Sequence, residues 1–278
     1  MTRAPVRWGS AVCRHLAYLG APVPLAALMI DAPHGLVHQS YAPADMRGSG
    51  TVNADGFGAV WYPPGAATPV HYRSDRPIWS DASFAAVARA TRSGAVLAAV
   101  RSATVGMPVT AQATPPFVTE RWAFSHNGVI PGWPESVSGL ATRLPVADLL
   151  TLDAPTDSAL LWALVRDRLR GGQDPAAALA GVVAEVAAAA PGARLNLVVT
   201  DGTGVWATAW GHALAVRVEP DAVLVASEPI DGDPSWRPVP DRHLVTARPG
   251  SVRVAELAAD PPRPVAAAGG GTREAGEP

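Results

Sequence analysis

The sequence predicts an α+β fold whose strands and helices are arranged in layers. Short apolar runs bounded by turn residues occur along most of the chain, a pattern typical of strands. Amphipathic helical segments are fewer and lie mid-chain, so strand and helix do not alternate regularly. With 278 residues, 48% hydrophobic and 17% charged, the chain can bury a sizeable core and is not disordered over its whole length.

Several short segments are predicted to be strands, and the last four of them to form a meander of antiparallel hairpins. Asp201-Gly202 separates two of these four, and Pro220-Asp221 separates the other two. Both dipeptides are typical of tight turns. The predicted strands are residues 95–101, 121–125, 195–200, 205–210, 213–218 and 222–227.

Three helices are predicted from residues that start and stop helices. Asp81 can cap the first, Thr156 the second, and Asp174, which is followed by proline, the third. The first runs to about Arg92, and Gly171 ends the second. The residues expected on the buried faces of the first two helices are Phe84, Val87, Ala88, Leu160, Leu161, Leu164 and Leu169.

One globular domain, residues 13–257, is expected to carry the function, and the chain has no internal repeat. The tail, residues 258–278, is rich in Pro, Gly and Ala with scattered charge. It is predicted to be disordered because it cannot bury enough apolar surface to offset its ordering entropy. Residues 1–12 show no recognisable structural pattern, and we expect this extension to be absent from the mature protein.

Charge and cysteine content exclude several function classes. The formal net charge is −2, so no basic field exists to neutralise phosphates, and we expect no nucleic-acid partner. No apolar run is long enough to cross a bilayer, and the N-terminal stretch lacks the apolar segment of a secretory signal. We therefore expect no membrane contact and a cytoplasmic location. A single cysteine excludes an internal disulfide framework and a cysteine-clustered zinc site.

We also expect no metal and no other cofactor. His34 and His38 have the spacing of one helix face, which would suit two metal ligands. Pro33 and Gly35 favour a loop there, however, and no third ligand is evident.

Cys13 is the candidate nucleophile, although a lone cysteine is more often a small buried hydrophobe. Val12 before it is compatible with a GTG start codon, in which case the chain begins Met-Cys and methionine removal leaves Cys13 first. An N-terminal cysteine has its own α-amine, of pKa about 7.7–8.0, which can take the thiol proton. The hypothesis requires that amine to be free, since a peptide bond makes the nitrogen non-basic.

Five segments, in order along the chain, carry a resemblance to a known family. They are residues 13–20 (CRHLAYLG), 53–58 (NADGFG), 100–104 (VRSAT), 126–128 (HNG) and 156–158 (TDS). Together they resemble the ergothioneine-pathway amidohydrolases of the class II glutamine amidotransferase group, which are N-terminal nucleophile hydrolases. The resemblance covers about residues 13–236. It implies a four-layer αββα sandwich of antiparallel sheets, with the cysteine at the end of a buried strand.

The resemblance also implies the activity. Family members cleave a γ-glutamyl amide through a cysteine thioester. The small-molecule substrate of the most similar subfamily is γ-glutamyl-hercynylcysteine sulfoxide, which yields glutamate and hercynylcysteine sulfoxide. One alternative is a glutaminase subunit that delivers ammonia to a partner synthase, and another is a non-catalytic relative that kept the fold. A homo-oligomer is possible.

Amide cleavage also needs donors for the oxyanion, and Asn127 and Gly128 are the candidates. They follow the predicted strand 121–125, so they are expected at a strand end. An asparagine NH2 and a backbone N–H can converge on one oxygen, each contributing about 3–4 kcal/mol in the transition state. Glycine lets the backbone approach closely. The alternative is an ordinary Asn-Gly hairpin turn.

Arg101 and Asp157 are the candidates for binding the glutamyl head. Arg101 ends an apolar run, which suits bidentate binding of the substrate α-carboxylate, and Thr104 can add a hydroxyl. The alternative for Arg101 is a surface arginine. In the family, the residue that matches Asp157 pairs with the α-ammonium group, whereas the alternative is simple helix capping.

Other residues are expected to support the site or to bind the rest of the substrate. Asn53, Asp55 and Gly56 form a predicted turn before a strand at residues 59–62, and we expect them to buttress the nucleophile. Hercynine carries a trimethylammonium group, which aromatic faces bind. Trp79 and Trp133 lie near matched motifs and are candidates for that contact, although tryptophans are more often packing residues.

Overall fold

The computed structural model describes residues 13–45, 52–66 and 68–257, and it confirms the α+β class. The predicted extension, residues 1–12, and the predicted disordered tail, residues 258–278, lie outside the described residues. Among the described residues, no helix is both long and apolar enough to span a membrane.

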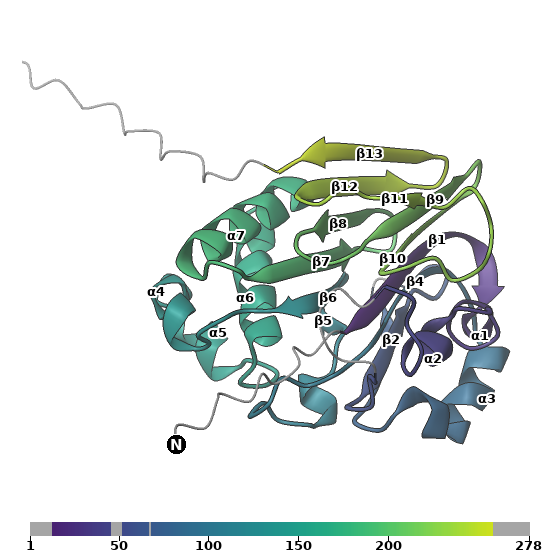
Figure 1. The fold of residues 1–278 in the computed structure, drawn as a ribbon, viewed down its shortest axis with the longest axis horizontal. Helices are drawn as coiled ribbons and strands as arrows, with labels where there is room; N and C mark the ends of the chain where they lie inside the picture. The colour runs from purple at the N-terminus through teal and green to yellow at the C-terminus, as the bar shows by residue number, and fades with distance from the viewer. Residues whose placement is uncertain (1–12, 46–51, 67, 258–278) are drawn as a thin grey trace, which may run out of the picture.

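Within the described ranges, the strands form two antiparallel sheets that pack face to face (Figure 1). One sheet has the strand order β11-β9-β10-β1-β4-β2-β3, and the other has the order β13-β12-β8-β7-β6-β5. The strands are β1 (Arg14–Pro24), β2 (Phe57–Trp61), β3 (Val70–Ser74), β4 (Arg92–Val100), β5 (Phe117–Thr119), β6 (Trp122–Val129), β7 (Arg194–Thr200), β8 (Val205–Ala209), β9 (Ala215–Glu219), β10 (Ala222–Ala226), β11 (Arg237–Pro238), β12 (His243–Arg248) and β13 (Ser251–Glu256).

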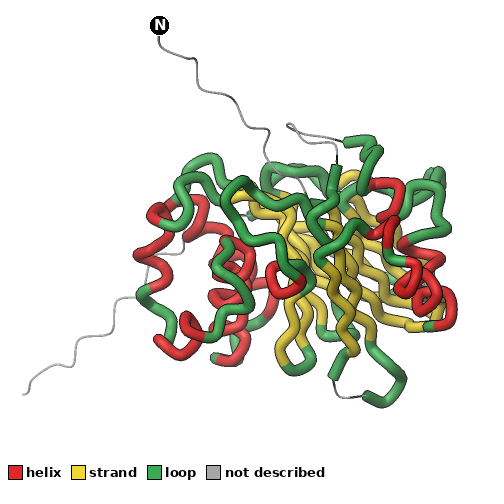
Figure 2. The backbone as a smooth tube through the Cα atoms, turned by 90° about the horizontal axis from the view of Figure 1, so that it is seen from below, coloured by secondary structure: helices red, strands yellow, loops and turns green. Residues whose placement is uncertain are grey.

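Helices cover the outer face of each sheet, which gives the four-layer αββα sandwich that the resemblance implied (Figure 2). Helices α1, α2 and α3 pack on the sheet that contains β1, whereas α6 and α7 pack on the sheet that contains β6. The helices are α1 (Leu25–Met29), α2 (Leu36–Gln39), η1 (Ile78–Ser80), α3 (Ala82–Ala90), η2 (Ala111–Ala113), η3 (Glu135–Val137), α4 (Ser138–Ala141), α5 (Val146–Leu150), α6 (Asp157–Arg170) and α7 (Pro175–Ala189).

Successive side chains of a buried strand belong to different apolar layers of the protein. In β1, Leu16 and Tyr18 pack with the residues of α1 and α3, while Ala17 and Leu19 pack against the second sheet. Successive side chains of a strand point to opposite faces, so one buried strand supplies two layers at once. For this reason β1 is almost wholly apolar after His15 rather than alternately polar.

The predicted meander of hairpins is wrong in its middle connection. β7 pairs with β8, and β9 pairs with β10, as the turn residues predicted. β8 and β9, however, lie in different sheets. The chain turns at Gly211, which has a φ of 84°, and crosses between the sheets through the buried Leu214. Turn residues fix local hairpins but carry no information about which sheet the next strand joins.

The two long helices confirm their predicted starts. Thr156 accepts a hydrogen bond from the backbone N–H of Ala159 at 3.2 Å, and Asp174 accepts one from Ala177 at 3.1 Å. These side chains satisfy N–H groups that have no partner within the helix. Gly171 ends α6, also as predicted.

The first predicted helix, α3, starts correctly but ends early. Asp81 accepts from the Phe84 N–H at 2.9 Å, but the helix ends at Ala90 because Arg92 already begins β4. Val87 is 39% exposed, so its predicted place on the buried face is wrong. The buried face of α3 is the i, i+4 pair Phe84 and Ala88.

Phe84 anchors the helical layer over β2, and its removal should destabilise the domain. Its ring lies 4.8 Å from that of Phe57 and 4.9 Å from that of Tyr72, and it is fully buried. We expect Phe84→Ala to lower the free energy of unfolding by about 3–5 kcal/mol. The matched control Val87→Ala, on the exposed side of α3, should cost about 0.5 kcal/mol or less. Urea unfolding measures both, and equal losses would contradict this packing.

Candidate active site

The candidate nucleophile lies beside the start of β1 and the end of β4. Arg14 at the start of β1 pairs with Val100 at the end of β4, which places Cys13 next to Arg101 and Ser102. The Cys13 thiol donates to the carbonyl oxygen of Ser102 at 3.7 Å. The sulfur therefore lies beside the backbone that follows the apolar strand β4.

The loop that contains Asn53, Asp55 and Gly56 holds this backbone in place. The N–H of Arg101 donates to the Gly56 oxygen at 2.8 Å, and the N–H of Asp55 donates to the Arg101 oxygen at 3.0 Å. One carboxylate oxygen of Asp55 accepts from Ala103 N–H at 2.8 Å. These bonds fix both neighbours of Ser102, whose carbonyl contacts the thiol.

Gly56 can only be glycine in this arrangement. Its φ is 124°, and a Cβ atom would lie 2.5 Å from the Thr114 hydroxyl oxygen. Asn53 is buried, and its N–H donates to the Ser40 oxygen at 2.6 Å. All three residues thus belong to the loop whose bonds hold the backbone on either side of Ser102.

The surroundings of the Cys13 thiol favour its neutral form. Burial is the main cause that raises the thiol pKa above its ordinary value, and the Asp157 carboxylate raises it further. The guanidinium charges of Arg101 and Arg14 oppose this shift. Within residues 13–45, 52–66 and 68–257, the thiol has no histidine or carboxylate as a hydrogen-bond partner. A proton acceptor for it must therefore come from elsewhere.

Asn127 and Gly128 lie within a strand, not after it. β6 continues to Val129, and Asn127 pairs with Asn196 of β7. The prediction that these residues follow the strand end is wrong, and so is the hairpin alternative. The local pattern missed this because His126, Asn127 and Gly128 are polar or small, although their strand is buried between neighbours.

The side chain of Asn127 reaches the end of β1 through a serine. Asn127 lies on the same face of β6 as Ala123, which packs between the sheets. Its Nδ2 donates to the Ser227 hydroxyl oxygen at 3.4 Å, and the backbone N–H of His15 donates to the same oxygen at 3.0 Å. The amide nitrogen carries a second hydrogen, which is available to a substrate oxygen.

The register of β6 turns the Gly128 N–H away from β7. The backbone N–H of Leu195, which is opposite Gly128, donates to Trp210 on the other side of β7. The Gly128–Leu195 pair is therefore of the type without mutual hydrogen bonds. β5 pairs with β6 only as far as Phe124, so it does not reach Gly128. A Cβ atom here would lie 1.8 Å from the Arg194 oxygen, which excludes other residues.

Asp157 is buried and held at the start of α6. One carboxylate oxygen accepts from Ile130 N–H at 3.2 Å, and the other accepts from Ser158 N–H at 2.7 Å. The Ser158 hydroxyl also bonds His126 Nδ1 at 2.9 Å. Burial lowers the pKa of His126, so this imidazole is neutral and adds no positive charge. Asp157 lies in the first turn of α6, where acidic side chains are favoured.

Arg101 is also buried, at 5% exposure, with Nη1 donating to the Pro108 oxygen at 2.9 Å. A guanidinium has five N–H donors, so most remain for an anionic ligand. Arg101 and Asp157 both act electrostatically on the Cys13 thiol. Their effects are opposite, since Arg101 lowers the thiol pKa and Asp157 raises it.

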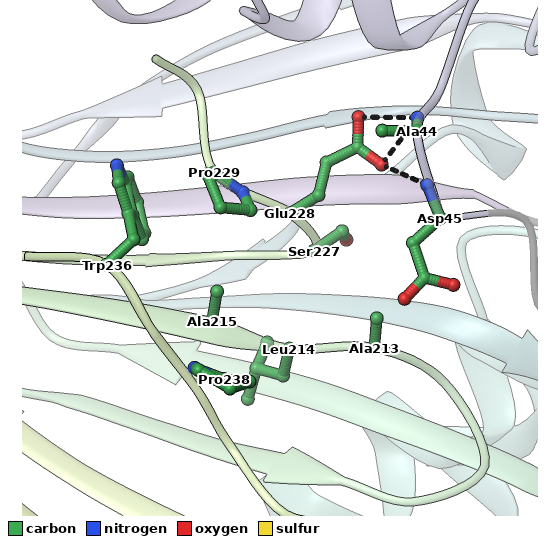
Figure 3. A pocket seen from close by; sticks show the side chains of 10 residues that line it. All are labelled: Ala44, Asp45, Ala213, Leu214, Ala215, Ser227, Glu228, Pro229, Trp236 and Pro238. Atoms are coloured by element: carbon green, nitrogen blue, oxygen red, sulfur yellow. Dashed lines mark hydrogen bonds between the residues drawn. The ribbon is translucent and has the colours of Figure 1, made fainter. Parts of the chain in front are cut away.

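Two cavities contain candidate site residues or residues that contact them. One, of about 520 Å³, is lined by Thr104, Ile130 and Trp133 among others, and Ile130 is the residue that donates to Asp157. The other, of about 550 Å³, includes Ser227 and Glu228 (Figure 3). Trp79 lines neither cavity and stands at the surface against Tyr41, with ring centroids 6.1 Å apart.

Sequence reasoning missed Ser227 and Glu228. Glu228 accepts from the backbone N–H groups of Ala44 and Asp45 at 3.0–3.1 Å and lies 3.9 Å from Arg14 Nε. Arg14 in turn donates to the carbonyl oxygens of Cys13 and Asp45 at 3.2 and 2.5 Å. The signal that could have found them is the one used for Arg101, namely polar residues at the end of an apolar strand.

Nothing in the described ranges gathers metal ligands. No group of three or more histidine, cysteine or acidic side chains there could hold an ion. His34 and His38 make an edge-to-face ring contact, with centroids 5.0 Å apart.

Comparisons with known proteins agree with this geometry. A family model for glutamine amidotransferases of class II matches residues 24–221. The gamma-glutamyl-hercynylcysteine sulfoxide hydrolase of Mycolicibacterium smegmatis is 45% identical over 88% of this chain and 100% of its own length. The protein of the same name from Mycobacterium tuberculosis is 42% identical over 88% and 97%. A glutamine aminotransferase class-II domain protein from Silicibacter pomeroyi shares the fold, with a TM-score of 0.64, 24% identity and coverage of 88% and 100%.

The raised thiol pKa predicts a measurable shift in alkylation. In the intact chain, Cys13 should reach half-maximal rate with iodoacetamide at a higher pH when folded than when denatured, because burial disfavours the thiolate. Arg101→Gln should move the midpoint higher still, since the guanidinium lowers the pKa. Arg92→Gln, at the exposed far end of β4, is the matched control. Since Cys13 is the single cysteine, mass spectrometry reads the site without ambiguity. A folded midpoint at or below the denatured one would contradict this account.

Proposed function

Because this chain belongs to the class-II glutamine amidotransferases, we propose that it hydrolyses γ-glutamyl-hercynylcysteine sulfoxide to glutamate and hercynylcysteine sulfoxide. The observation that carries the proposal is a thiol on which Arg101 and Asp157 act electrostatically, with the Asn127 amide bonded to Ser227 beside the start of β1. The relatives that bear this name match nearly the whole described chain.

Cys13 is the nucleophile of the proposed reaction. Its thiolate attacks the γ-carbonyl carbon, the C–N bond breaks as the leaving amine takes a proton, and water then hydrolyses the glutamyl thioester. Because burial raises the thiol pKa, ionisation needs a base in contact with the sulfur. The α-amine of Cys13 supplies it when the chain begins at this residue, as the sequence predicted. That start is a prediction that the described residues do not test.

Asn127 Nδ2 and the Gly128 N–H stabilise the oxyanion of the two tetrahedral intermediates. Both belong to a strand held between neighbours, so the donors are fixed before the substrate binds. Fixed donors avoid reorganisation during the reaction, which is why they lower the barrier more than water does. Ser227 holds the Asn127 amide by its first hydrogen.

Arg101 and Asp157 bind the two charged groups of the glutamyl head. The Arg101 fork pairs with the α-carboxylate, the Asp157 carboxylate pairs with the α-ammonium, and the Thr104 hydroxyl adds a bond to the carboxylate. Both charged groups are buried, so a ligand that lacks either charge leaves one of them unpaired. This selects α-amino acids over simple acids.

The glutaminase alternative is not favoured, because three curated relatives at 42–45% identity are named hydrolases. The cytoplasmic location, the lack of nucleic-acid partners and a possible homo-oligomer stay predictions from the sequence.

Replacing the nucleophile tests the proposed function directly. We expect Cys13→Ala to reduce hydrolysis of γ-glutamyl-hercynylcysteine sulfoxide to the background rate, because no thioester can form. Product analysis by mass spectrometry measures the loss, and a glutamyl adduct on Cys13 should be trapped from the unsubstituted enzyme by rapid acid quenching. The urea midpoint of the variant is the control for folding. Turnover near that of the unsubstituted enzyme would refute the assignment.

Asp157→Asn should act on substrate capture and depend on the substrate ammonium group. We expect kcat/KM for the γ-glutamyl substrate to fall by about thirtyfold or more, because a buried charge loses its partner. The glutaryl analogue, which lacks the amino group, should lose far less. Asp174→Asn, at the start of α7, is the matched control for helix capping. Equal losses on the two substrates would rule out the ammonium contact.

A further inference from the structure

His126 is a buried side chain that the proposed chemistry does not use. It is 1% exposed and lies in β6 on the same face as Phe124, whose ring stacks on that of Trp162 in α6 with centroids 5.4 Å apart. The imidazole therefore points toward the helical layer, whereas the neighbouring Asn127 side chain points between the sheets. There it contacts Ser158 at the start of α6, so two segments far apart in the sequence meet.

A backbone carbonyl fixes the tautomer of His126. Nε2 lies 2.9 Å from the Arg194 carbonyl oxygen, which can only accept, so Nε2 carries the hydrogen. Burial lowers the pKa of His126, so the ring is neutral and has this one N–H. Nδ1 is then an acceptor, and the Ser158 hydroxyl, 2.9 Å away, donates to it.

That bond uses the single hydrogen of the Ser158 hydroxyl. The same Oγ also lies 3.3 Å from Asp157 Oδ1, which is the longer of the two contacts. A hydroxyl cannot donate one hydrogen to both acceptors, so neutral His126 draws it away from the carboxylate. Within the described ranges, the Asp157 oxygens then accept the backbone N–H groups of Ile130 and Ser158, one each.

We propose that His126 is a positioning residue, which holds the Ser158 hydrogen away from Asp157 Oδ1 and so leaves that oxygen open to the α-ammonium group of the substrate. A carboxylate has about four lone-pair sites, and each site that a protein donor occupies is lost to the ligand. This inference rests on the proposed function, because it assigns the ammonium contact to Asp157. His126 does not touch the substrate in this account and acts through Ser158.

Two replacements of His126 in the purified full chain separate its two nitrogens. The amide of His126→Gln reaches the place of Nε2 and can donate to the Arg194 oxygen, but it offers Ser158 no acceptor at the place of Nδ1. The amide oxygen of His126→Asn lies near the place of Nδ1 and can accept from Ser158. We expect His126→Gln to weaken binding of L-glutamate, the glutamyl product, by about tenfold, and His126→Asn by about threefold or less.

A second substitution should rescue the first. Ser158→Ala in the His126→Gln background removes the hydrogen that turned to Asp157, and should return the L-glutamate Kd to within about threefold of the unsubstituted value. The Kd of glutarate, which lacks the amino group, should change by less than about twofold. His243→Gln is the matched control, because the His243 ring also bonds a carbonyl oxygen, that of Asp241, at 2.8 Å. Calorimetry measures each Kd.

Two further measurements separate positioning from a merely structural role. In hydrolysis, His126→Gln should raise KM by about the factor seen in binding and leave kcat within about twofold, because the ammonium contact is the same in the ground and transition states. Nitrogen NMR of the unsubstituted protein with labelled histidine needs no variant, and it should show His126 as the neutral Nε2–H tautomer.

The outcomes distinguish this role from the proposed function. An Nδ1–H tautomer, a double variant that binds L-glutamate no better than His126→Gln, or equal losses for glutarate would each refute the positioning role while the proposed function stands. If the expected binding pattern is found but the unsubstituted enzyme does not hydrolyse γ-glutamyl-hercynylcysteine sulfoxide, the proposed function fails and the positioning role stands.

Discussion

The site depends on the pairing of β1 between β4 and β10. A nucleophile that uses its own α-amine must be at a chain start, where chains are usually poorly ordered. Here the residues after Cys13 enter the middle of a sheet at once, with Arg14 opposite Val100 and Leu16 opposite both Ala98 and Ala226. Hydrogen bonds on both sides of β1 fix the position of the sulfur.

A single hydroxyl connects this anchored strand to Asn127. Ser227 follows β10 and donates its backbone N–H to the His15 oxygen, while its hydroxyl oxygen accepts from the His15 N–H and from Asn127 on the facing sheet. The two sheets otherwise meet through apolar side chains, which pack without direction. Hydrogen bonds are directional, so Ser227 sets the angle of the amide relative to the sulfur in a way that the apolar layer cannot. Burial lowers the pKa of His15 to about 3, so its imidazole is neutral and adds no charge beside Ser227.

Much of the fold and site could be predicted from local sequence, and the failures share one cause. Helix caps such as Thr156 and turns such as Asp201-Gly202 act over a few residues, so they were confirmed. The crossing from β8 to β9 and the extension of β6 through Gly128 depend on partners far along the chain. Ser227 ends an apolar strand, which is a local signal, but its contact with His15, more than two hundred residues away, could not be predicted from that signal. The resemblance supplied long-range order that periodicity could not.

The charged groups beside the nucleophile act on the same thiol in opposite directions. The Asp157 carboxylate raises the pKa of Cys13, whereas the guanidinium groups of Arg101 and Arg14 lower it. Arg14 also donates to the Cys13 carbonyl oxygen and lies 3.9 Å from the buried Glu228 carboxylate. A neutral residue at this position would leave Glu228 without this cation and make the thiol harder to ionise, so the burial of Glu228 and the reactivity of Cys13 are coupled through one guanidinium.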